Sequence, residues 1–390
     1  MFELIILLLP IAAASGWIAA RRSSDKREQK QLQDCSPVYF KGLNYLLNEQ
    51  PDKAIDVFIK MLEVDSDTVE THMALGNLFR RRGEVERAIR IHQNLIARPS
   101  LSREQRAQAL LELGQDYMRA GLFDRAENLF VELTETKLYN TQALTNLLEI
   151  YQQEKDWQRC LEIANQLGTG KDVMLRTQTA HYYCELAQRE LKSHNTSLAE
   201  DYIRKAQAAD RNCVRATILQ GNMQRERGDC KSAIKTYQRV EEQDSAYMPE
   251  VLVGLKSCYL TQGRHKELME YLRALYARHP GSSVMLVLTD LMIEDGGEEQ
   301  AIDFALKHLS GNPDLMVLDR LIYLSLKRQD QRPHETLQVL KQAVRQLLTA
   351  QPAYLCEHCG FGLKRLHWLC PSCKTWSSIK PLQGSVYQVD

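Results

Sequence analysis

The sequence predicts an all-α protein, and three observations support this prediction. Small residues recur with a period of 34 along most of the 390 residues. An uncharged apolar run, Leu4 to Ala20, stands near the N-terminus. Two Cys-x-x-Cys pairs stand near the C-terminus. The chain therefore divides into an apolar N-terminal helix, a long helical body and a small cysteine-containing end.

The helical body, residues 36–350, is built from a repeated unit. Gly42 precedes Gly76 by 34 residues, and Ala54 precedes Ala88 by the same step. A period of 34 is the length of the tetratricopeptide repeat, a pair of antiparallel helices. Small residues let two such helices approach closely, and an aromatic residue such as Phe58 fills the space towards the next repeat. The length of the body predicts a right-handed superhelix of about nine repeats, or about eighteen helices.

Turn signals and irregular spacings refine this prediction. Glycines stand between expected helices, as in Arg82-Gly83-Glu and Arg227-Gly228-Asp, and predict tight turns. Two spacings deviate from the period. Four extra residues enter around Ser100 to Arg103, and we expect the segment from Gly168 to Thr196 to contain a lengthened loop.

The N-terminal run has the length and the flanks of a membrane anchor. Seventeen uncharged residues, Leu4 to Ala20, are at the lower limit for crossing a bilayer. Arg21 and Arg22 follow the run directly, and the positive-inside rule then places the remaining chain in the cytoplasm. A cleaved signal peptide is the alternative, but its positive charge would precede the apolar run. We predict a single transmembrane anchor at residues 1–20 and a basic juxtamembrane linker at residues 21–35.

The C-terminal cysteines have the spacing of a metal site. Two Cys-x-x-Cys pairs are separated by ten residues and supply four thiolates, Cys356, Cys359, Cys370 and Cys373. Two tight turns brought face to face give a tetrahedral sulfur cage that suits zinc or iron. Gly360 after the first pair suits a turn that needs a positive φ, whereas Lys374 after the second pair is less well suited. Two disulfides are the alternative, and they would need an oxidising compartment.

Aromatic and histidine residues surround these cysteines. We expect Trp368 and Trp376, with Phe361 and Leu366, to cover the metal and to dock the domain against the last repeats. Trp368 and Trp376 are also candidate partner-binding residues. The histidines in this segment, His358 and His367, are alternative ligands, but four cysteines already complete the coordination shell.

Composition and charge exclude some functions. The formal net charge is zero, which argues against a dedicated nucleic-acid-binding protein. The six cysteines outside the two pairs show no pairing pattern, which is typical of reduced core residues in a reducing cytosol. These six are Cys35, Cys160, Cys184, Cys213, Cys230 and Cys258.

Catalytic motifs are missing from the sequence. The segment from Leu167 to Asp172 faintly resembles a phosphate-binding loop, but it lacks the earlier glycine and the Ser or Thr after Lys171. Neither an H-E-x-x-H zinc motif nor a G-x-S-x-G nucleophile motif occurs. We therefore predict that the protein is not an enzyme.

A basic segment is the main candidate for binding through charge. Eight arginines and three glutamates lie between Arg80 and Arg106, and they include the run Arg80, Arg81 and Arg82. We predict these three arginines as partner-binding residues for an acidic protein surface or lipid headgroups. A solvated helix face is the alternative.

The order of these modules, with Cys356-Glu-His-Cys359-Gly-Phe and Cys370-Pro-Ser-Cys373-Lys at the end, resembles the lipopolysaccharide assembly protein B family of the Gram-negative inner membrane. The resemblance covers the whole chain. It implies that residues 351–390 form a rubredoxin-like domain whose four cysteines hold one iron or zinc ion. The short gap between the pairs departs from true rubredoxins and favours a structural role over electron transfer.

The resemblance also implies a function. It suggests a cytoplasmic adaptor that brings the deacetylase LpxC to the membrane protease FtsH, and an anti-adaptor of the PbgA/YejM (LapC) type as its regulator. Two other classes remain open. A general scaffold would assemble lipopolysaccharide-synthesis or transport proteins without changing the lifetime of a client, and a redox or metal sensor would need a reducible, coloured iron site. A homo-oligomer is compatible with all three.

Overall fold

The computed structural model describes residues 37–48, 50–64, 69–168, 172–311, 314–327 and 334–382. Within these ranges, eighteen α-helices precede a small three-stranded sheet, and the chain forms two compact units that meet between Glu154 and Lys155. The predicted anchor and linker, residues 1–35, lie outside the described part. None of the described helices is long and apolar enough to cross a membrane.

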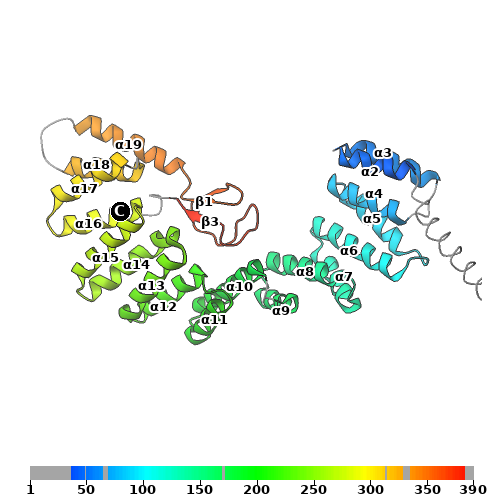
Figure 1. The fold of residues 1–390 in the computed structure, drawn as a ribbon, viewed down its shortest axis with the longest axis horizontal. Coiled ribbons are helices and arrows are strands. Elements are labelled where there is room, and N and C mark those ends of the chain that lie inside the picture. Colours follow the sequence, from blue (N-terminus) through cyan, green and yellow to red (C-terminus); the bar gives the residue numbers. More distant parts are fainter. Residues whose placement is uncertain are drawn as a thin grey trace, which may run out of the picture. The chain divides into compact units, whose positions relative to one another are not determined.

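The first unit consists of successive helical hairpins joined by short turns (Figure 1). Its helices are α2 (Pro37–Leu47), α3 (Pro51–Val64), α4 (Val69–Arg81), α5 (Val85–Ile96), α6 (Arg103–Arg119), α7 (Phe123–Thr136) and α8 (Asn140–Glu154).

The second unit continues the same pattern and ends in the sheet. Its helices are α9 (Trp157–Leu167), α10 (Val173–Lys192), α11 (Thr196–Ala209), α12 (Val214–Glu226), α13 (Cys230–Asp244), the 3-10 helix η1 (Ser245–Tyr247), α14 (Met248–Thr261), α15 (His265–Arg278), α16 (Ser282–Glu294), α17 (Glu298–Gly311), α18 (Leu315–Lys327) and α19 (His334–Ala350). The strands are β1 (Tyr354–Cys356), β2 (Gly362–Leu363) and β3 (Ile379–Pro381).

The predicted close approach of paired helices is confirmed. A Cβ placed on Gly114 of α6 would lie 2.5 Å from the ring of Phe130 on α7, so this packing requires glycine. The same relation joins Gly221 of α12 to Tyr237 of α13, where the distance is 2.4 Å. In each pair the ring lies sixteen residues after the glycine. The alanines of the repeat are completely buried, namely Ala54, Ala88, Ala126, Ala199 and Ala233.

The predicted glycine turns are confirmed as well. Gly83 and Gly228 have φ values of 83° and 80°, in the left-handed region that favours glycine. After Gly83, the N–H of Glu84 donates to the carbonyl of Phe79 on α4 at 2.9 Å. This 6→1 hydrogen bond ends the first helix of the repeat as in a Schellman motif.

The predicted lengthened loop between Gly168 and Thr196 lies partly outside the described residues, which end at Gly168 and resume at Asp172. Within the described part, this segment contains a long helix, because α10 has twenty residues. The Asp172 side chain accepts hydrogen bonds from the backbone N–H groups of Met174 and Leu175 and so starts α10 early. At the other predicted insertion, Ser102 and Gln105 form a capping box that starts α6.

Candidate metal centre

The four cysteines lie on two tight turns held by the small sheet. Strand β1 pairs antiparallel with β2 and β3, in the order β2-β1-β3. This pairing places Cys356 at the end of β1, opposite Ile379 of β3. A β-bridge between Leu369 and Trp376 closes the second turn around Cys370 and Cys373. We call residues 354–381 the knuckle domain.

The two turns share one backbone geometry. The N–H of Gly360 donates to the carbonyl of Cys356 at 2.8 Å, and the N–H of Lys374 donates to the carbonyl of Cys370 at 3.0 Å. Gly360 has a φ of 73° and Lys374 a φ of 58°. The lysine therefore occupies a left-handed position that glycine would adopt at lower cost.

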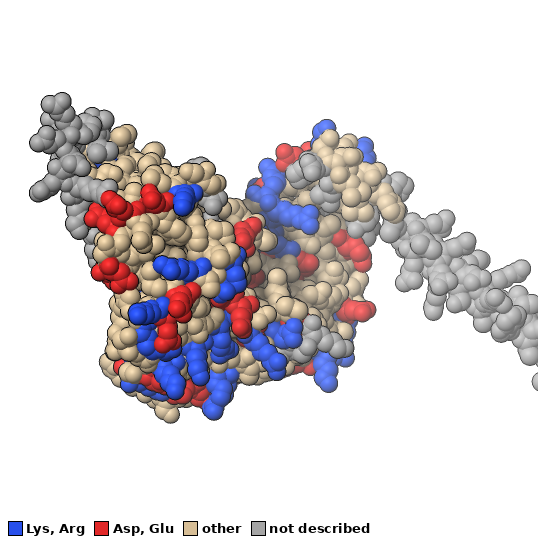
Figure 2. Space-filling view, turned by 60° about the vertical axis from the view of Figure 1, so that its left-hand side comes forward, with Lys and Arg blue, Asp and Glu red and all other residues tan. Residues whose placement is uncertain are grey.

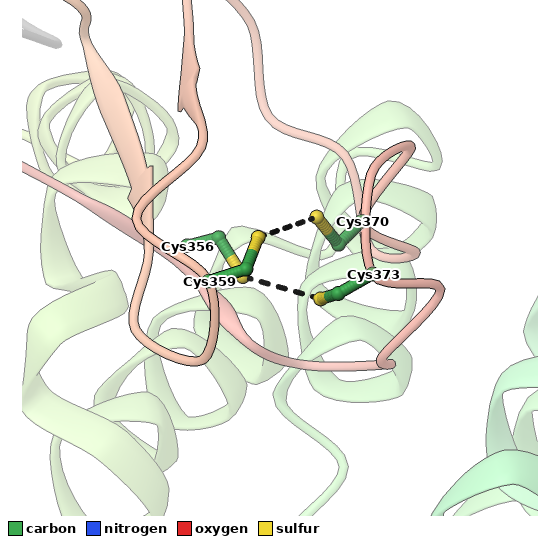
Figure 3. Close-up of side chains that lie close together, drawn as sticks. All are labelled: Cys356, Cys359, Cys370 and Cys373. Carbon is green, nitrogen blue, oxygen red and sulfur yellow. Dashed lines mark hydrogen bonds between the residues drawn. The ribbon is translucent and has the colours of Figure 1, made fainter. Parts of the chain in front are cut away.

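The sulfur atoms face one another across the two turns (Figure 3). All four Sγ atoms lie within 4.8 Å of one another. Two cross-turn distances, from Cys356 to Cys373 and from Cys359 to Cys370, are both 3.7 Å. Metal–sulfur bonds of about 2.3 Å in a tetrahedron require sulfur–sulfur distances of about 3.8 Å. The site thus fits one four-coordinate zinc or iron ion, and the geometry favours neither metal.

Hydroxyl groups support two of the sulfurs as thiolates. Burial opposes ionisation of Cys356, but the Ser378 hydroxyl and the N–H of Cys359 offset this effect and lower its pKa. The Thr375 hydroxyl lowers the pKa of Cys373 to about 5. Because a metal ligand must be deprotonated, these contacts favour binding at neutral pH.

The remaining sulfurs differ in environment. Burial raises the pKa of Cys370 to about 11, so a bound cation must offset this cost. The side chain of Cys359 is exposed. His358 and His367 are exposed and stand outside the four-sulfur group. The arrangement is therefore a closed four-cysteine site without an open position for a substrate.

The knuckle domain packs on the middle repeats, in contrast to our prediction that it docks on the last ones. In Figure 1 it lies beside the green helices around α10 to α14. The Trp376 ring is 7% exposed and stacks on the His181 ring of α10, with 4.7 Å between centroids. It also meets the rings of Trp157 on α9 and Tyr182 on α10 edge-on. A ring predicted to meet a partner is thus enclosed by the chain itself.

Trp368 and the sheet extend this interface to α12 and α14. The half-buried Trp368 ring lies 5.2 Å from the ring of Tyr247 on η1 and 5.9 Å from the guanidinium of Arg215 on α12. The Tyr247 hydroxyl donates to the carbonyl of Ile379 at 2.9 Å. From β1, the Tyr354 hydroxyl donates to Glu250 of α14 at 2.9 Å. These contacts are polar and aromatic, so they fix one orientation of the domain.

The predicted basic residues divide into one internal and two exposed arginines. Arg80 is 14% exposed and pairs with Asp116 at 2.8 Å and with Glu112. Arg81 is exposed, and Arg82 forms exposed ion pairs with Asp52 and Glu84. Arg80 is therefore committed to packing between α4 and α6, and partner binding through Arg81 and Arg82 stays a prediction.

Acidic and basic side chains are interspersed on the face of the molecule in Figure 2. This mixture agrees with the formal net charge of zero. The five described cysteines outside the knuckle domain are buried, which confirms that they are core residues, and the reducing compartment stays a prediction. The sixth, Cys35, lies outside the described residues.

Sequence reasoning missed the residues of the repeats that receive the knuckle domain. His181, Arg215, Tyr247 and Glu250 come from four different elements. Their only sequence signal is a polar or aromatic side chain on a helix that is otherwise rich in apolar residues. No spacing rule links them, because they converge only in the folded chain.

Known protein families match both the helical repeats and the knuckle domain of this chain. A family model described as a rubredoxin metal binding domain matches residues 354–381, and tetratricopeptide repeat models match residues 71–106 and 184–249. Lipopolysaccharide assembly protein B of Escherichia coli (strain K12) is 41% identical over 386 residues, which cover 98% of this chain and 99% of that protein. The protein of the same name from Haemophilus influenzae is 36% identical over 393 residues, with the same coverage.

Proposed function

This chain belongs to the lipopolysaccharide assembly protein B family, and on that premise we propose that it is a membrane-tethered cytoplasmic adaptor. It would limit lipopolysaccharide synthesis by promoting the degradation of the deacetylase LpxC by the protease FtsH. The observation that carries the proposal is the match to family members over 98% of the chain. The repeats and the four-cysteine domain occur in the same chain as expected for this family.

The architecture supports an adaptor more than an enzyme. Helical repeats present long surfaces to other proteins, since each repeat adds a similar pair of helices. The metal would be held by Cys356, Cys359, Cys370 and Cys373 and would act as a cross-link between the two turns. These four sulfurs would complete the coordination shell and would leave no open position on the metal for a reaction. The role of the knuckle domain would then be to support the middle repeats.

Tethering supplies the mechanism in this proposal. An anchor at residues 1–20 would hold the repeats beside FtsH in the inner membrane and raise the effective concentration of a bound client. Tight contacts are not needed for such an effect. An anti-adaptor of the PbgA/YejM (LapC) type would act by competing for the same repeats.

The test is the half-life of LpxC in cells after protein synthesis is blocked. We compare cells with the full chain, cells without it, cells with a variant that lacks residues 1–20, and cells with Cys370→Ser. We expect LpxC to persist in the last three, although the truncated protein still binds LpxC in a pull-down. A matched Ser372→Ala variant controls for changes in the second turn that leave the ligands intact.

An unchanged half-life in all four strains would contradict the adaptor proposal. A general assembly scaffold would then be the better explanation, and it predicts several lipopolysaccharide-synthesis partners in pull-downs. The sensor alternative predicts that zinc-loaded protein loses function while iron-loaded protein retains it. Full activity of the truncated form would show that tethering is not the mechanism.

A further inference from the structure

Two pairs of cysteines lie in contact inside the repeats that carry the knuckle domain. Cys184 of α10 and Cys213 at the start of α12 have their sulfur atoms 3.9 Å apart. Cys230 of α13 and Cys258 of α14 also interact through their thiols. All four are buried and free. The two pairs have the same chemistry, so their surroundings decide whether they differ in reactivity.

In the first pair, Cys213 lies near positively charged groups. Cys213 is the N-cap residue of α12, where backbone N–H groups carry partial positive charge. The hydrogen bond from Cys184, the N–H of Ala216 and the charge of Arg215 lower the pKa of Cys213, although burial and Asp210 oppose them. By contrast, burial raises the pKa of Cys184. Within this pair, the surroundings therefore favour ionisation of Cys213 over ionisation of Cys184.

The second pair differs in the balance of its surroundings. Burial and the contact with Cys230 together raise the pKa of Cys258 to about 12, although the charge of Arg225 opposes them. Cys230 is the first residue of α13, but its N-cap is Asp229, whose carboxylate already accepts the hydrogen bond from Ser232. This pair is a matched internal control for burial and for sulfur contact.

A cavity lies beside the turn that precedes Cys213. The turn before Cys213, from Ala208 to Asn212, lines a cavity of about 280 Å³ together with Val173 and Arg176 of α10. Asp210 holds this turn through hydrogen bonds to Thr177 and to the backbone N–H of Asn212. Cys213 directly follows the lining residues in the chain, and its side chain is 5% exposed. Oxidation of Cys213 would therefore require that this turn opens locally to admit a small oxidant.

We propose that Cys184 and Cys213 form a redox-reactive dithiol that hydrogen peroxide oxidises to a disulfide. The Cys213 thiolate attacks one peroxide oxygen, an S–O bond forms, the O–O bond breaks, and the leaving hydroxide takes a proton to become water. The Cys184 sulfur then attacks the Cys213 sulfenic acid, loses its proton, and displaces a second water. Two thiols lose two electrons in total, and the two peroxide oxygens gain them.

The product would link α10 to α12 beneath the knuckle domain. Arg215 lies two residues after Cys213. Its guanidinium donates a hydrogen bond to Glu185 of α10 at 2.9 Å and lies over the Trp368 ring. Drawing the two sulfurs from 3.9 Å to the bond length of about 2 Å must move the cysteine side chains beside Arg215. We expect the environment of Trp368, and hence its fluorescence, to change on oxidation.

The test is mass-spectrometric peptide mapping of the full chain, loaded with zinc because zinc is not redox-active. The protein is treated with hydrogen peroxide, free thiols are trapped by alkylation, and metal content is followed in parallel. We expect the Cys184–Cys213 disulfide to form faster than any Cys230–Cys258 disulfide, because the thiolate is the attacking species. Zinc should stay bound, and dithiothreitol should reverse the change.

Two variants separate the roles of the sulfurs. In Cys184→Ser, which keeps a hydrogen-bond donor, Cys213 should stop at a sulfenic acid that dimedone traps, and Cys258→Ala should oxidise at the first pair like the unaltered chain. Equal rates at the two pairs, absence of the disulfide, or its appearance only after zinc loss would overturn the proposal. The mapping of the unaltered chain decides the question even if a variant fails to fold.

Discussion

The repeats and the knuckle domain are stabilised in opposite ways. In the repeats, each pair of helices buries its own side chains, such as Phe130 against Gly114, and a neighbour repeats the arrangement. The buried cluster of the knuckle domain has only four residues, Tyr354, Cys356, Cys370 and Ile379. A domain this small needs a metal or a docking surface to fold.

The stability of the repeats is therefore spread over many similar contacts, whereas the stability of the knuckle domain is concentrated in its metal site and its docking surface. Loss of one contact in the repeats should be local, since each repeat touches only its neighbours. Loss of one metal ligand in the knuckle domain should unfold the whole domain. The following predictions test this contrast, beginning with the largest effect.

Cys370→Ser should abolish the fold of the knuckle domain. Removing one of four thiolates forfeits most of a metal-binding free energy that is on the order of 10 kcal/mol in small zinc domains. Metal analysis should show loss of the ion, and tryptophan fluorescence should report exposure of Trp368 and Trp376. Far-ultraviolet circular dichroism should keep the helical signal of the repeats. A variant that retains one metal per chain would show that three sulfurs suffice.

Phe130→Ala should destabilise the first unit by about 3–5 kcal/mol, because a fully buried ring leaves a cavity between α6 and α7. Urea unfolding measures the change, and Val131→Ala, at a neighbouring residue that is 39% exposed, is the matched control. Metal content should not change. Equal effects of the two substitutions would mean that the aromatic position of the repeat carries no special packing.

Trp376→Ala should separate docking from metal binding. We expect a loss of about 3 kcal/mol in docking, since the ring fills the space among Trp157, His181 and Tyr182. Hydrogen exchange in α10 should increase while the metal stays bound. Phe361→Ala, at a 44% exposed position of the same domain, should change neither quantity. Release of the metal from Trp376→Ala would show that docking and coordination are one cooperative event.

His181 should make docking sensitive to acid. Burial and the charge of Arg215 hold the pKa of His181 well below its usual value of 6.5. The undocked or unfolded state takes up a proton near pH 6.5 but the docked state does not. The stabilisation is therefore present above pH 6.5 and is lost as the pH falls towards the lower pKa of the docked state. The loss should approach about 1.4 kcal/mol per pH unit.

Urea unfolding at pH 7.5 and pH 5.5 measures this effect in the unaltered chain and in His181→Gln. The glutamine variant should lose less stability between the two pH values, because it cannot take up the proton. Other groups, including His308, contribute equally to both proteins and cancel in the comparison. Identical pH dependence of the two proteins would contradict the role of His181.

The smallest expected effect compares the two turns of the metal centre. Lys374→Gly should stabilise the knuckle domain by about 1 kcal/mol, because glycine adopts the left-handed φ of 58° without strain. Gly360→Ala should destabilise it by a similar amount, since the space around a Cβ there is open and only the φ of 73° matters. Competition with a chelator measures both. Equal metal affinity of all three proteins would show that turn strain is absorbed elsewhere.

Much of the fold was predictable because it is periodic. The 34-residue step from Ala54 to Ala88 and the glycine turns gave the helical hairpins, and their residues are buried or left-handed as expected. The spacing of Cys356, Cys359, Cys370 and Cys373 gave the metal site for the same reason, since each pair closes a local turn. The length of α10 was not predicted, because the sequence reasoning did not use the capping carboxylate of Asp172.

The sequence by itself therefore determined the features that depend on neighbours along the chain, namely the hairpins, the turns and the four-sulfur site. Only the tertiary structure decided where the knuckle domain docks and that Arg80 and Trp376 face the interior. It also brought Cys184 and Cys213 together. These features join residues from elements that are distant in sequence, such as His181 and Ser377, whose side chains lie 2.6 Å apart. Their contact depends on the accumulated geometry of several repeats, and no local pattern records that geometry.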